Sequence, residues 1–332
     1  MFRQGSKIRS LLINLGLVSV SLALMLCVGE AAVRIAYPQL ANYNLEMWRY
    51  SSELKQPLDR KDLPFLHYPN REGNYYGVNI KTNSEGLRDV EHVRGKRADK
   101  TRVVMIGDSF MLGWGVRAED GIPDNLARML NRDGDRYEVI NLGVGNYNTT
   151  MEADLFEWKG LAFHPDIAVL LFFVNDSEPV PRVSWLSRIV RKRSYLLAFL
   201  FDRYVALRPL LDRDFRWQTY YASLYAPDAP ALEENRAAVR HIAELCRKNN
   251  VRLLIANYPE LHELKNYPFP QATEHIRSLA AESQVPFVDL LPSFAPHAPE
   301  SLWVSDEDTH GNALACRIAA QGIYEALRAD PK

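Results

Sequence analysis

The chain has 332 residues, of which 47% are hydrophobic, and a formal net charge of -1 at pH 7. This length and hydrophobic content suffice for one large domain or two modest ones with a real core. The balanced charge argues against a protein that binds nucleic acid through a broadly basic surface. Cys27, Cys246 and Cys316 lie far apart, so we expect neither a disulfide framework nor a cysteine metal site. We expect the last two to be small core residues of amphipathic helices.

Basic residues precede an apolar run at the N-terminus. Arg3, Lys7 and Arg9 come before residues 11–28, which contain no charged side chain. A run of this length can just cross a bilayer. The basic flank predicts a cytoplasmic N-terminus, with residues 30–332 on the far side of the membrane. We therefore expect an uncleaved anchor; a cleaved signal peptide and a lipid-modified Cys27 are the alternatives, and all three export the rest of the chain.

The segment between this run and residue 100 has no long periodicity. Residues 1–29 are expected to form the cytoplasmic tip and the transmembrane helix. Residues 30–100 mix prolines, tyrosines and charges, and we expect an N-terminal arm or small subdomain there. Within it, residues 75–89 predict a short extended pair that turns at residues 83–86.

From residue 101 to about 330, short apolar runs alternate with amphipathic segments. The predicted strands are 102–106, 137–141, 167–173, 252–257 and 286–290, and the predicted helices are about 121–132, 149–161, 231–249, 272–283 and 312–328. This alternation predicts an α/β fold in which a parallel sheet of about five strands carries helices on both faces. The functional loops of such a sheet lie at the carboxyl ends of its strands.

Residues 178–230 interrupt the alternation with many aromatic side chains and a basic run at 188–193. One interpretation is a helical insertion whose aromatic residues pack on the sheet domain. The other is a cap over the site that grips substrate or rests on the membrane surface. Residues 195–201 are apolar but far too few to span a membrane.

Small polar residues follow the predicted strands. Asp108-Ser109 ends the first strand, Asn141 ends the second, Asn175-Asp176 follows the third, and residues 305–312 precede the last helix. In a parallel sheet these segments converge at one edge. A serine, a histidine with neighbouring carboxylates, and amide donors are the groups that acyl transfer requires.

The segments "GDSFMLGWGV", "VINLGVGNYNT" and "FFVND", together with "DTHGN" near the C-terminus, resemble the SGNH, or GDSL-type, hydrolase superfamily. They are especially similar to a bacterial exported branch whose members often carry an N-terminal membrane anchor. The resemblance covers about residues 101–328. It implies a flavodoxin-like three-layer α/β/α sandwich and a serine-dependent reaction on esters.

The resemblance also implies the catalytic groups. Ser109 would be the nucleophile, His310 would accept and return its proton, and a carboxylate would orient His310. The superfamily usually places an aspartate three residues before the histidine, a position that Glu307 occupies here. Asp308 stands two residues before His310, as in relatives with a D-x-H-x-N arrangement, and we favour Asp308 over Glu307.

Three groups would stabilise the oxyanion: the side-chain amide of Asn175, the backbone N–H of Ser109, and a backbone N–H in the turn after the second strand. In the superfamily this backbone N–H usually belongs to a glycine. Asn146 aligns best with that glycine, and Gly145 comes directly before Asn146. Asparagine tolerates left-handed backbone better than most residues. Which of the two amides points inward stays open.

Simpler roles compete with these. Asp108-Ser109 can cap a helix, and Asn175-Asp176 can form a turn. For Asp306 we expect the role of an acid at a helix N-terminus. Trp114 either lines an acyl pocket or plugs its loop against the core. Seven histidines without a neighbouring acid and helix start are interpreted as surface or structural: His67, His92, His164, His241, His262, His275 and His297.

The sequence therefore predicts a membrane-anchored, extracytoplasmic serine esterase or O-acyltransferase of SGNH type. Its substrates would be acylated or acetylated carbohydrates of the envelope or an exopolysaccharide, or other small esters, and a lipase is a further alternative. No metal-ligand spacing and no phosphate-binding glycine loop occurs, so we expect no metal and no cofactor. The alternative from another class is a non-catalytic, polysaccharide-binding SGNH-like domain, which the altered acid spacing and Asn146 favour.

Overall fold

The computed structural model describes residues 2–95, 98–181, 193–211 and 216–329. At its centre lies a parallel sheet with the strand order β6-β5-β7-β8-β9. The strands are β5 (Thr101–Ile106), β6 (Tyr137–Asn141), β7 (Ile167–Phe172), β8 (Arg252–Asn257) and β9 (Phe287–Asp289). This is the flavodoxin-like order, and it confirms the predicted sheet. The order reverses beside β5, so a crevice for ligands is expected at the carboxyl end of that strand.

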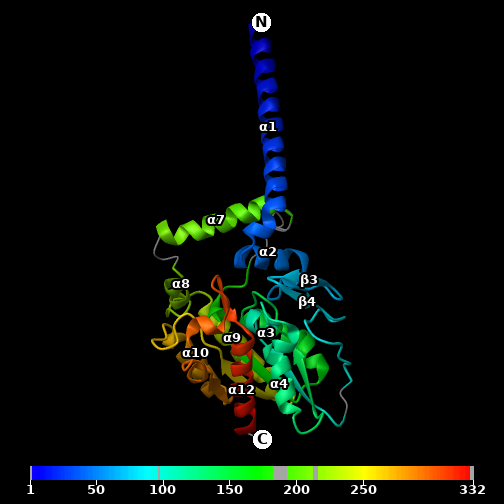
Figure 1. Ribbon diagram of the computed structural model, residues 1–332, viewed down its shortest axis with the longest axis vertical. Coiled ribbons are helices and arrows are strands. Elements are labelled where there is room, and N and C mark those ends of the chain that lie inside the picture. Colours follow the sequence, from blue (N-terminus) through cyan, green and yellow to red (C-terminus); the bar gives the residue numbers. More distant parts are fainter. Residues whose placement is uncertain (1, 96–97, 182–192, 212–215, 330–332) are drawn as a thin grey trace.

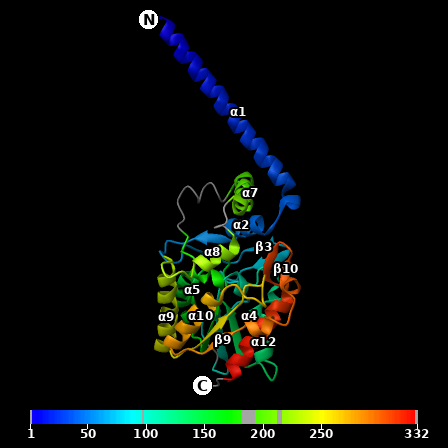
Figure 2. The ribbon, with the colours of Figure 1, turned by 90° about the vertical axis from the view of Figure 1, so that its left-hand side faces the viewer.

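Helices cover both faces of the sheet (Figures 1 and 2). Because successive side chains of a strand point to opposite faces, Val104 and Ile106 belong to one buried cluster, and Val103 and Met105 to another. Double burial explains why the strands read as continuous apolar runs. The first cluster is covered by α5 (Thr149–Leu155), α9 (Leu232–Lys248) and α10 (Pro270–Glu282), and the second by α4 (Ile122–Leu130) and α12 (Ala313–Ala329).

Two predicted core cysteines lie in these helices. Cys246 on α9 and Cys316 on α12 are both buried, which confirms that prediction. Short elements complete the domain: α3 (Ser109–Leu112), η1 (Ala118–Asp120), η2 (Phe156–Gly160), η3 (Leu161–Phe163), η4 (Val174–Ser177), α11 (Leu291–Phe294), η6 (Pro299–Leu302), β10 (Trp303–Ser305) and β11 (Asp308–Gly311).

The N-terminal arm packs over the carboxyl edge of the sheet. It contains α2 (Tyr43–Glu53) and the antiparallel pairs β1 (Lys55–Pro57) with β2 (Phe65–His67) and β3 (Glu72–Tyr75) with β4 (Val78–Lys81). The predicted turn at residues 83–86 is wrong for this second pair, which turns at Tyr76 and Gly77, both with positive φ. Residues 83–87 form a separate turn, in which the Asn83 side chain accepts the N–H groups of Glu85 and Leu87.

Helix α1 (Phe2–Leu40) projects away from the domain (Figure 1). It continues beyond the apolar run that ends at residue 28. Within the described part of the chain, its segment Leu11–Leu40 is long and apolar enough to cross a membrane, and its most apolar stretch is not buried by the rest of the chain. An N-terminal apolar helix of this kind is either a signal sequence or an anchor.

Two helices belong to the predicted insertion. Helix α7 (Tyr195–Leu211) lies across the base of α1, and α8 (Trp217–Ser223) packs on the sheet domain (Figures 1 and 2). Residues 188–192, which hold most of the basic run, lie outside the described residues.

Gly143, in the loop after β6, lies against the backbone of α3. A Cβ atom added there would lie 2.2 Å from the backbone N of Leu112 and 2.5 Å from the carbonyl C of Met111. The loop and α3 therefore approach as closely as glycine allows. We predict that Gly143→Ala lowers the free energy of unfolding by about 1–3 kcal/mol, measured by urea titration.

Gly95→Ala is the matched control, because an added Cβ there meets no atom within 4 Å. Equal unfolding midpoints for the Gly143 and Gly95 variants would show that α3 moves aside without cost.

Candidate active site

A tight turn after β5 presents Ser109. The strand ends at Ile106, and a Cβ on Gly107 would lie 2.7 Å from that of Met111, so only glycine fits where the chain turns. The side chain of Asp108 caps α3 by accepting the N–H of Phe110 at 2.9 Å. Ser109 is then the first residue of α3. One turn thus serves both predicted purposes: Asp108 caps a helix, and Ser109 lies at the end of the strand.

The histidine and its acid lie on a β-hairpin formed by β10 and β11. The exposed residues Asp306 and Glu307 form its turn, and α12 begins only at Ala313. The expectation that Asp306 is an acid at a helix N-terminus is therefore wrong, since the segment is extended instead. In an extended strand, residues two apart share a face, so Asp308 and His310 point the same way.

Ser109, His310 and Asp308 form a continuous hydrogen-bonded chain. Ser109 Oγ lies 2.9 Å from His310 Nε2, and His310 Nδ1 lies 2.6 Å from Asp308 Oδ1. The carboxylate fixes the proton on Nδ1, so the lone pair of Nε2 faces the serine hydroxyl. Such a pair can take the proton of a serine that attacks a carbonyl carbon.

Trp114 holds the other oxygen of the acid. Asp308 is buried, and its Oδ2 accepts the indole N–H of Trp114 at 2.8 Å. Trp114 is enclosed by side chains of the arm, including Met47, Tyr50 and Tyr75. Of its two predicted roles, Trp114 therefore has the second, which is to hold its loop against a core. Its hydrogen bond to Asp308 could not be read from the sequence.

Two aromatic rings flank the imidazole. Phe110 stacks on His310 with ring centroids 4.7 Å apart and planes 27° apart, and Tyr43 from the arm lies at 5.3 Å. Both rings restrict the tilt of the imidazole. The position of Tyr43, far from residue 310 in sequence, has no local sequence signal.

The predicted amide donors lie around the same pocket. Asn175, on η4, donates its side-chain amide to Asp108 Oδ2 at 3.2 Å. Asn146 has φ 63°, the left-handed conformation that asparagine tolerates, and lines the pocket with Ser109. The N–H of Gly145 is instead donated to the Tyr50 hydroxyl at 3.1 Å. The N–H of Ser109 is at the first position of α3, where no carbonyl of that helix can accept it.

Several carboxyls are buried behind the serine. Burial raises the pKa of Asp108, and it raises the pKa values of Asp176 and Glu152 well above their usual range. In each case the cause is removal of the carboxyl from water, which disfavours its charged form. Asp176 also caps η4 through the N–H of Phe173 at 3.0 Å, so the predicted turn role applies to it.

The pocket above Ser109 has a volume of about 230 Å³ and includes groups that sequence reasoning missed. Trp217 and Tyr221 come from α8 in the insertion. Glu260 and His262 follow β8, and their side chains are hydrogen-bonded to each other. His262 is exposed, as its interpretation as a surface residue predicted, but it also lines this pocket and stacks on Trp217 at 4.3 Å. Its place after a strand end was the available signal.

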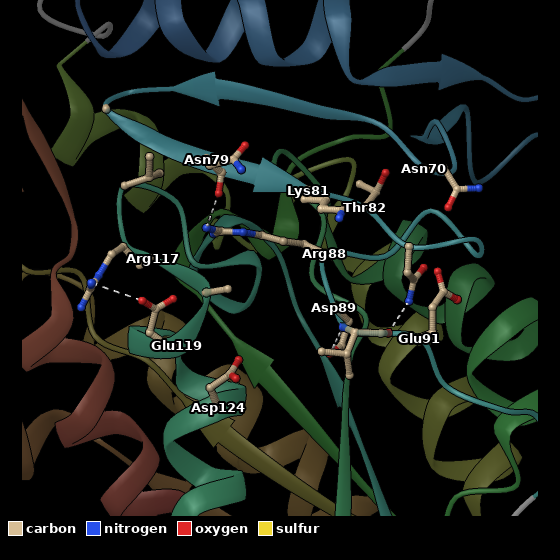
Figure 3. A pocket seen from close by; sticks show the side chains of 15 residues that line it. Asn70, Asn79, Lys81, Thr82, Arg88, Asp89, Glu91, Arg117, Glu119 and Asp124 are labelled. Atoms are coloured by element: carbon tan, nitrogen blue, oxygen red, sulfur yellow. Dashed lines mark hydrogen bonds and ion pairs between the residues drawn. The ribbon is translucent and has the colours of Figure 1, made fainter.

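A separate cavity of about 790 Å³ lies between the arm and α4 (Figure 3). The buried guanidinium of Arg88 crosses it and donates to the carbonyls of Asn79, Leu112 and Val116. Its lining does not include Ser109 or His310. Arg88 therefore ties the arm to the loop after α3 and has no place in the serine pocket.

The pattern of the family described as GDSL-like Lipase/Acylhydrolase matches residues 105–318, more than half of the chain. The chain belongs to this family. This is the family that the sequence motifs resemble. Over 127 residues this GDSL-type chain is 32% identical to an acetylxylan esterase of Xylanibacter ruminicola, a match that covers 35% of the chain and 26% of that esterase. It spans about a quarter of the length of this curated relative.

Solved structures similar to this GDSL-type chain are distant in sequence. TesA has a TM-score of 0.48 at 12% identity, covering 69% of the chain and 99% of TesA. The acetyl xylan esterase AlAXEase has a TM-score of 0.44 at 18% identity, with 68% and 99% covered. The esterase EstA from Pseudoalteromonas sp. has a TM-score of 0.46 at 10% identity, with 69% and 98% covered.

His67 links the arm to the loop after β6. Its Nδ1 donates to the carbonyl of Gly86 at 2.9 Å, so its Nε2 accepts the Tyr50 hydroxyl, which in turn accepts the N–H of Gly145. Burial, aided by the nearby Lys55 cation, lowers the pKa of His67 from 6.5 to about 3. The neutral ring is therefore the native form.

We predict that the stability provided by neutral His67 is complete above pH 6.5 and is lost as the pH falls toward 3. The unfolded chain binds a proton in that window and the folded chain does not. The measurement is the difference in free energy of unfolding between the wild type and His67→Phe as a function of pH. The difference should shrink on acidification, whereas a constant difference would mean that the folded ring titrates normally.

For Trp114→Phe we predict a less stable and slower enzyme. The substitution keeps an aromatic ring but leaves Asp308 Oδ2 buried without this donor, which costs about 1–3 kcal/mol of stability. Hydrolysis of a soluble aryl ester should show a lower kcat with little change in KM, because the acid then orients His310 less firmly. The half-exposed Trp158 gives the control variant Trp158→Phe, and equal kcat values for the two variants would contradict the role of Trp114.

Proposed function

We propose that the chain is a serine esterase that forms an acyl-enzyme on Ser109 and releases short acyl groups from carbohydrates. The observation that carries the proposal is the chain of hydrogen bonds from Ser109 through His310 to the buried Asp308. A serine hydroxyl alone is a weak nucleophile, and this arrangement is the usual means of activating it.

In the proposed reaction, Ser109 Oγ attacks the ester carbonyl carbon while His310 Nε2 takes its proton. Asp308 stabilises the resulting imidazolium. The C–O bond of the ester then breaks, and His310 returns the proton to the departing alcohol. His310 Nε2 next takes a proton from water, or from a sugar hydroxyl in a transferase reaction, as its oxygen attacks the acyl carbonyl carbon. The bond from that carbon to Ser109 Oγ then breaks, the proton returns to Oγ, and the carboxylic acid or the new ester leaves.

Three donors would stabilise the negative oxygen of each tetrahedral intermediate: the N–H groups of Ser109 and Asn146, and the side-chain amide of Asn175. Gly145 is not proposed for this role, because its N–H is donated to Tyr50. One hydrogen of the Asn175 amide binds Asp108, which aims the other. Removal of one such donor typically costs about 3 kcal/mol in the barrier.

The pocket favours a small acyl group on a polar alcohol. Its volume of about 230 Å³ suits an acetyl or similarly short group. Glu260, His262 and Glu307 give part of its wall hydrogen-bonding groups of the kind that sugar hydroxyls need. The acetylxylan esterase of Xylanibacter ruminicola supports the same class of substrate by its name.

The proposal places the enzyme on a membrane. Helix α1 would be an uncleaved anchor, with the catalytic domain outside the cytoplasm, because basic residues precede its apolar run. Acylated carbohydrates of the cell envelope or an exopolysaccharide would then be within reach of the domain.

The first test compares 4-nitrophenyl acetate with 4-nitrophenyl octanoate, using the full chain in detergent. We predict a higher kcat/KM for the acetate, and release of acetate from an acetylated oligosaccharide. A preference for octanoate would contradict the short-acyl proposal and favour a lipase.

The second test uses variants in the same assay. Ser109→Ala should lose at least about 10³-fold in kcat, and Asn175→Ala about 10²-fold with little change in KM. Ser278→Ala, which removes a partly exposed hydroxyl on α10 outside the pocket, should retain full activity. If Ser109→Ala hydrolysed the acetate as fast as Ser278→Ala, the measured activity would not arise from this site.

A further inference from the structure

Helix α7 carries an apolar stripe that the described residues leave partly exposed. Leu197, Leu200, Tyr204 and Leu207 recur at helical spacing on one side and are between 40% and 57% exposed. Asp202, on the opposite side, is buried and accepts the side-chain amides of Asn42 and Asn44 at 3.1 Å each. Asp202 therefore fixes the helix to the arm. Tyr204 and Leu207 face outward, whereas Leu197 and Leu200 also border the groove between α2 and α7.

The N-terminus of α7 contacts α1 at Gly29 and Glu30. The carboxylate of Glu30 accepts the N–H groups of Tyr195 and Leu196 at 3.0 and 2.9 Å, which caps the first turn of α7. Gly29 packs against Leu196, since a Cβ there would meet its side chain at 3.0 Å. Arg34 donates to the carbonyl of Arg193 at 2.8 Å.

Gly29 and Glu30 are also the residues at which α1 would leave a bilayer. A bilayer core about 30 Å thick needs about 20 helical residues, and the uncharged run of α1 ends at residue 28. Gly29 and Glu30 then lie at the level of the lipid headgroups. Helix α7 starts beside these two residues and runs across the base of α1 (Figures 1 and 2), so it would lie along the surface of such a bilayer.

We propose that α7 is an interfacial helix whose apolar stripe binds the surface of the lipid bilayer. A helix with one apolar side inserts that side at the boundary between headgroups and acyl chains. The domain would then be held against the membrane by two contacts, α1 through the bilayer and α7 along it. This inference rests on the proposed anchor for the position of the membrane, and its test separates the two.

The groove under α7 faces the serine pocket. It has a volume of about 760 Å³ between α2 and α7, and Asn146 lines both the groove and the pocket above Ser109. Binding of α7 to lipid would therefore keep the pocket of Ser109 close to the membrane surface. Substrates attached to the membrane would be presented to it there.

Site-specific fluorescence tests the inference on the full chain in vesicles of phosphatidylcholine and phosphatidylglycerol. Single cysteines replace Leu200 or Leu207 in a Cys27→Ser background, where Cys246 and Cys316 are buried. Each is labelled with an environment-sensitive dye, and quenching by a lipid spin-labelled on its acyl chain is measured. Two reference labels complete the set: one on the native Cys27 within α1, and one at Gln321→Cys, exposed on α12 at the far end of the domain (Figure 1).

Lipid quenching of about twofold or more at residues 200 and 207, with almost none at 321, is the expected result. Absence of quenching at 200 and 207 overturns the inference, and a blue-shifted label that lipid does not quench means that protein covers the stripe instead. Quenching at Cys27 alone would leave the anchor intact while removing α7 from the membrane. An unquenched Cys27 would refute the anchor. Unchanged thermal unfolding of the labelled variants controls for folding.

Discussion

The buried carboxylate of Asp308 joins the parts of the molecule that form the site. An ionised carboxylate is costly to bury unless donors surround it. Asp308 receives the backbone N–H of His310 and the ring N–H at Nδ1, and on its other oxygen the indole N–H of Trp114. The first two donors come from its own hairpin, and the third comes from the loop after α3. The acid, the histidine and the serine are therefore held in register by one group.

The N-terminal arm is part of this construction. Trp114 sits in a cluster with Tyr50 and Tyr75, and Tyr43 lies against His310. Through Tyr50, the arm also fixes the N–H of Gly145 beside the pocket, which leaves Asn146 in its left-handed conformation at the wall. Since α1 leads directly into this arm, the same short segment connects the long N-terminal helix to the pocket of Ser109.

The local patterns of the sequence were sufficient to predict the sheet and to predict that Ser109, His310 and Asp308 lie together at its edge. Strand periodicity and the rule that sites lie at strand ends need no long-range information. The contact between Trp114 and Asp308 could not be predicted, because it depends on how an irregular arm folds over the sheet. The hairpin of β10 and β11 was also missed, since its acidic turn resembles a helix start. His262 follows a predicted strand, but its place in the pocket depends on its contacts with Glu260 and Trp217, and the contact with Trp217 joins segments far apart in sequence.

The most direct test of the account is covalent labelling of the full chain by a fluorophosphonate, followed by intact mass and peptide mapping. An activated serine attacks the phosphorus atom and expels fluoride, so the adduct reports Ser109 and His310 together without a choice of ester. The account predicts one adduct per chain, on Ser109, which is lost in both Ser109→Ala and His310→Ala. A folded wild-type chain that takes no label, or a Ser109→Ala chain that takes it equally, would contradict the account and favour a polysaccharide-binding domain without catalysis.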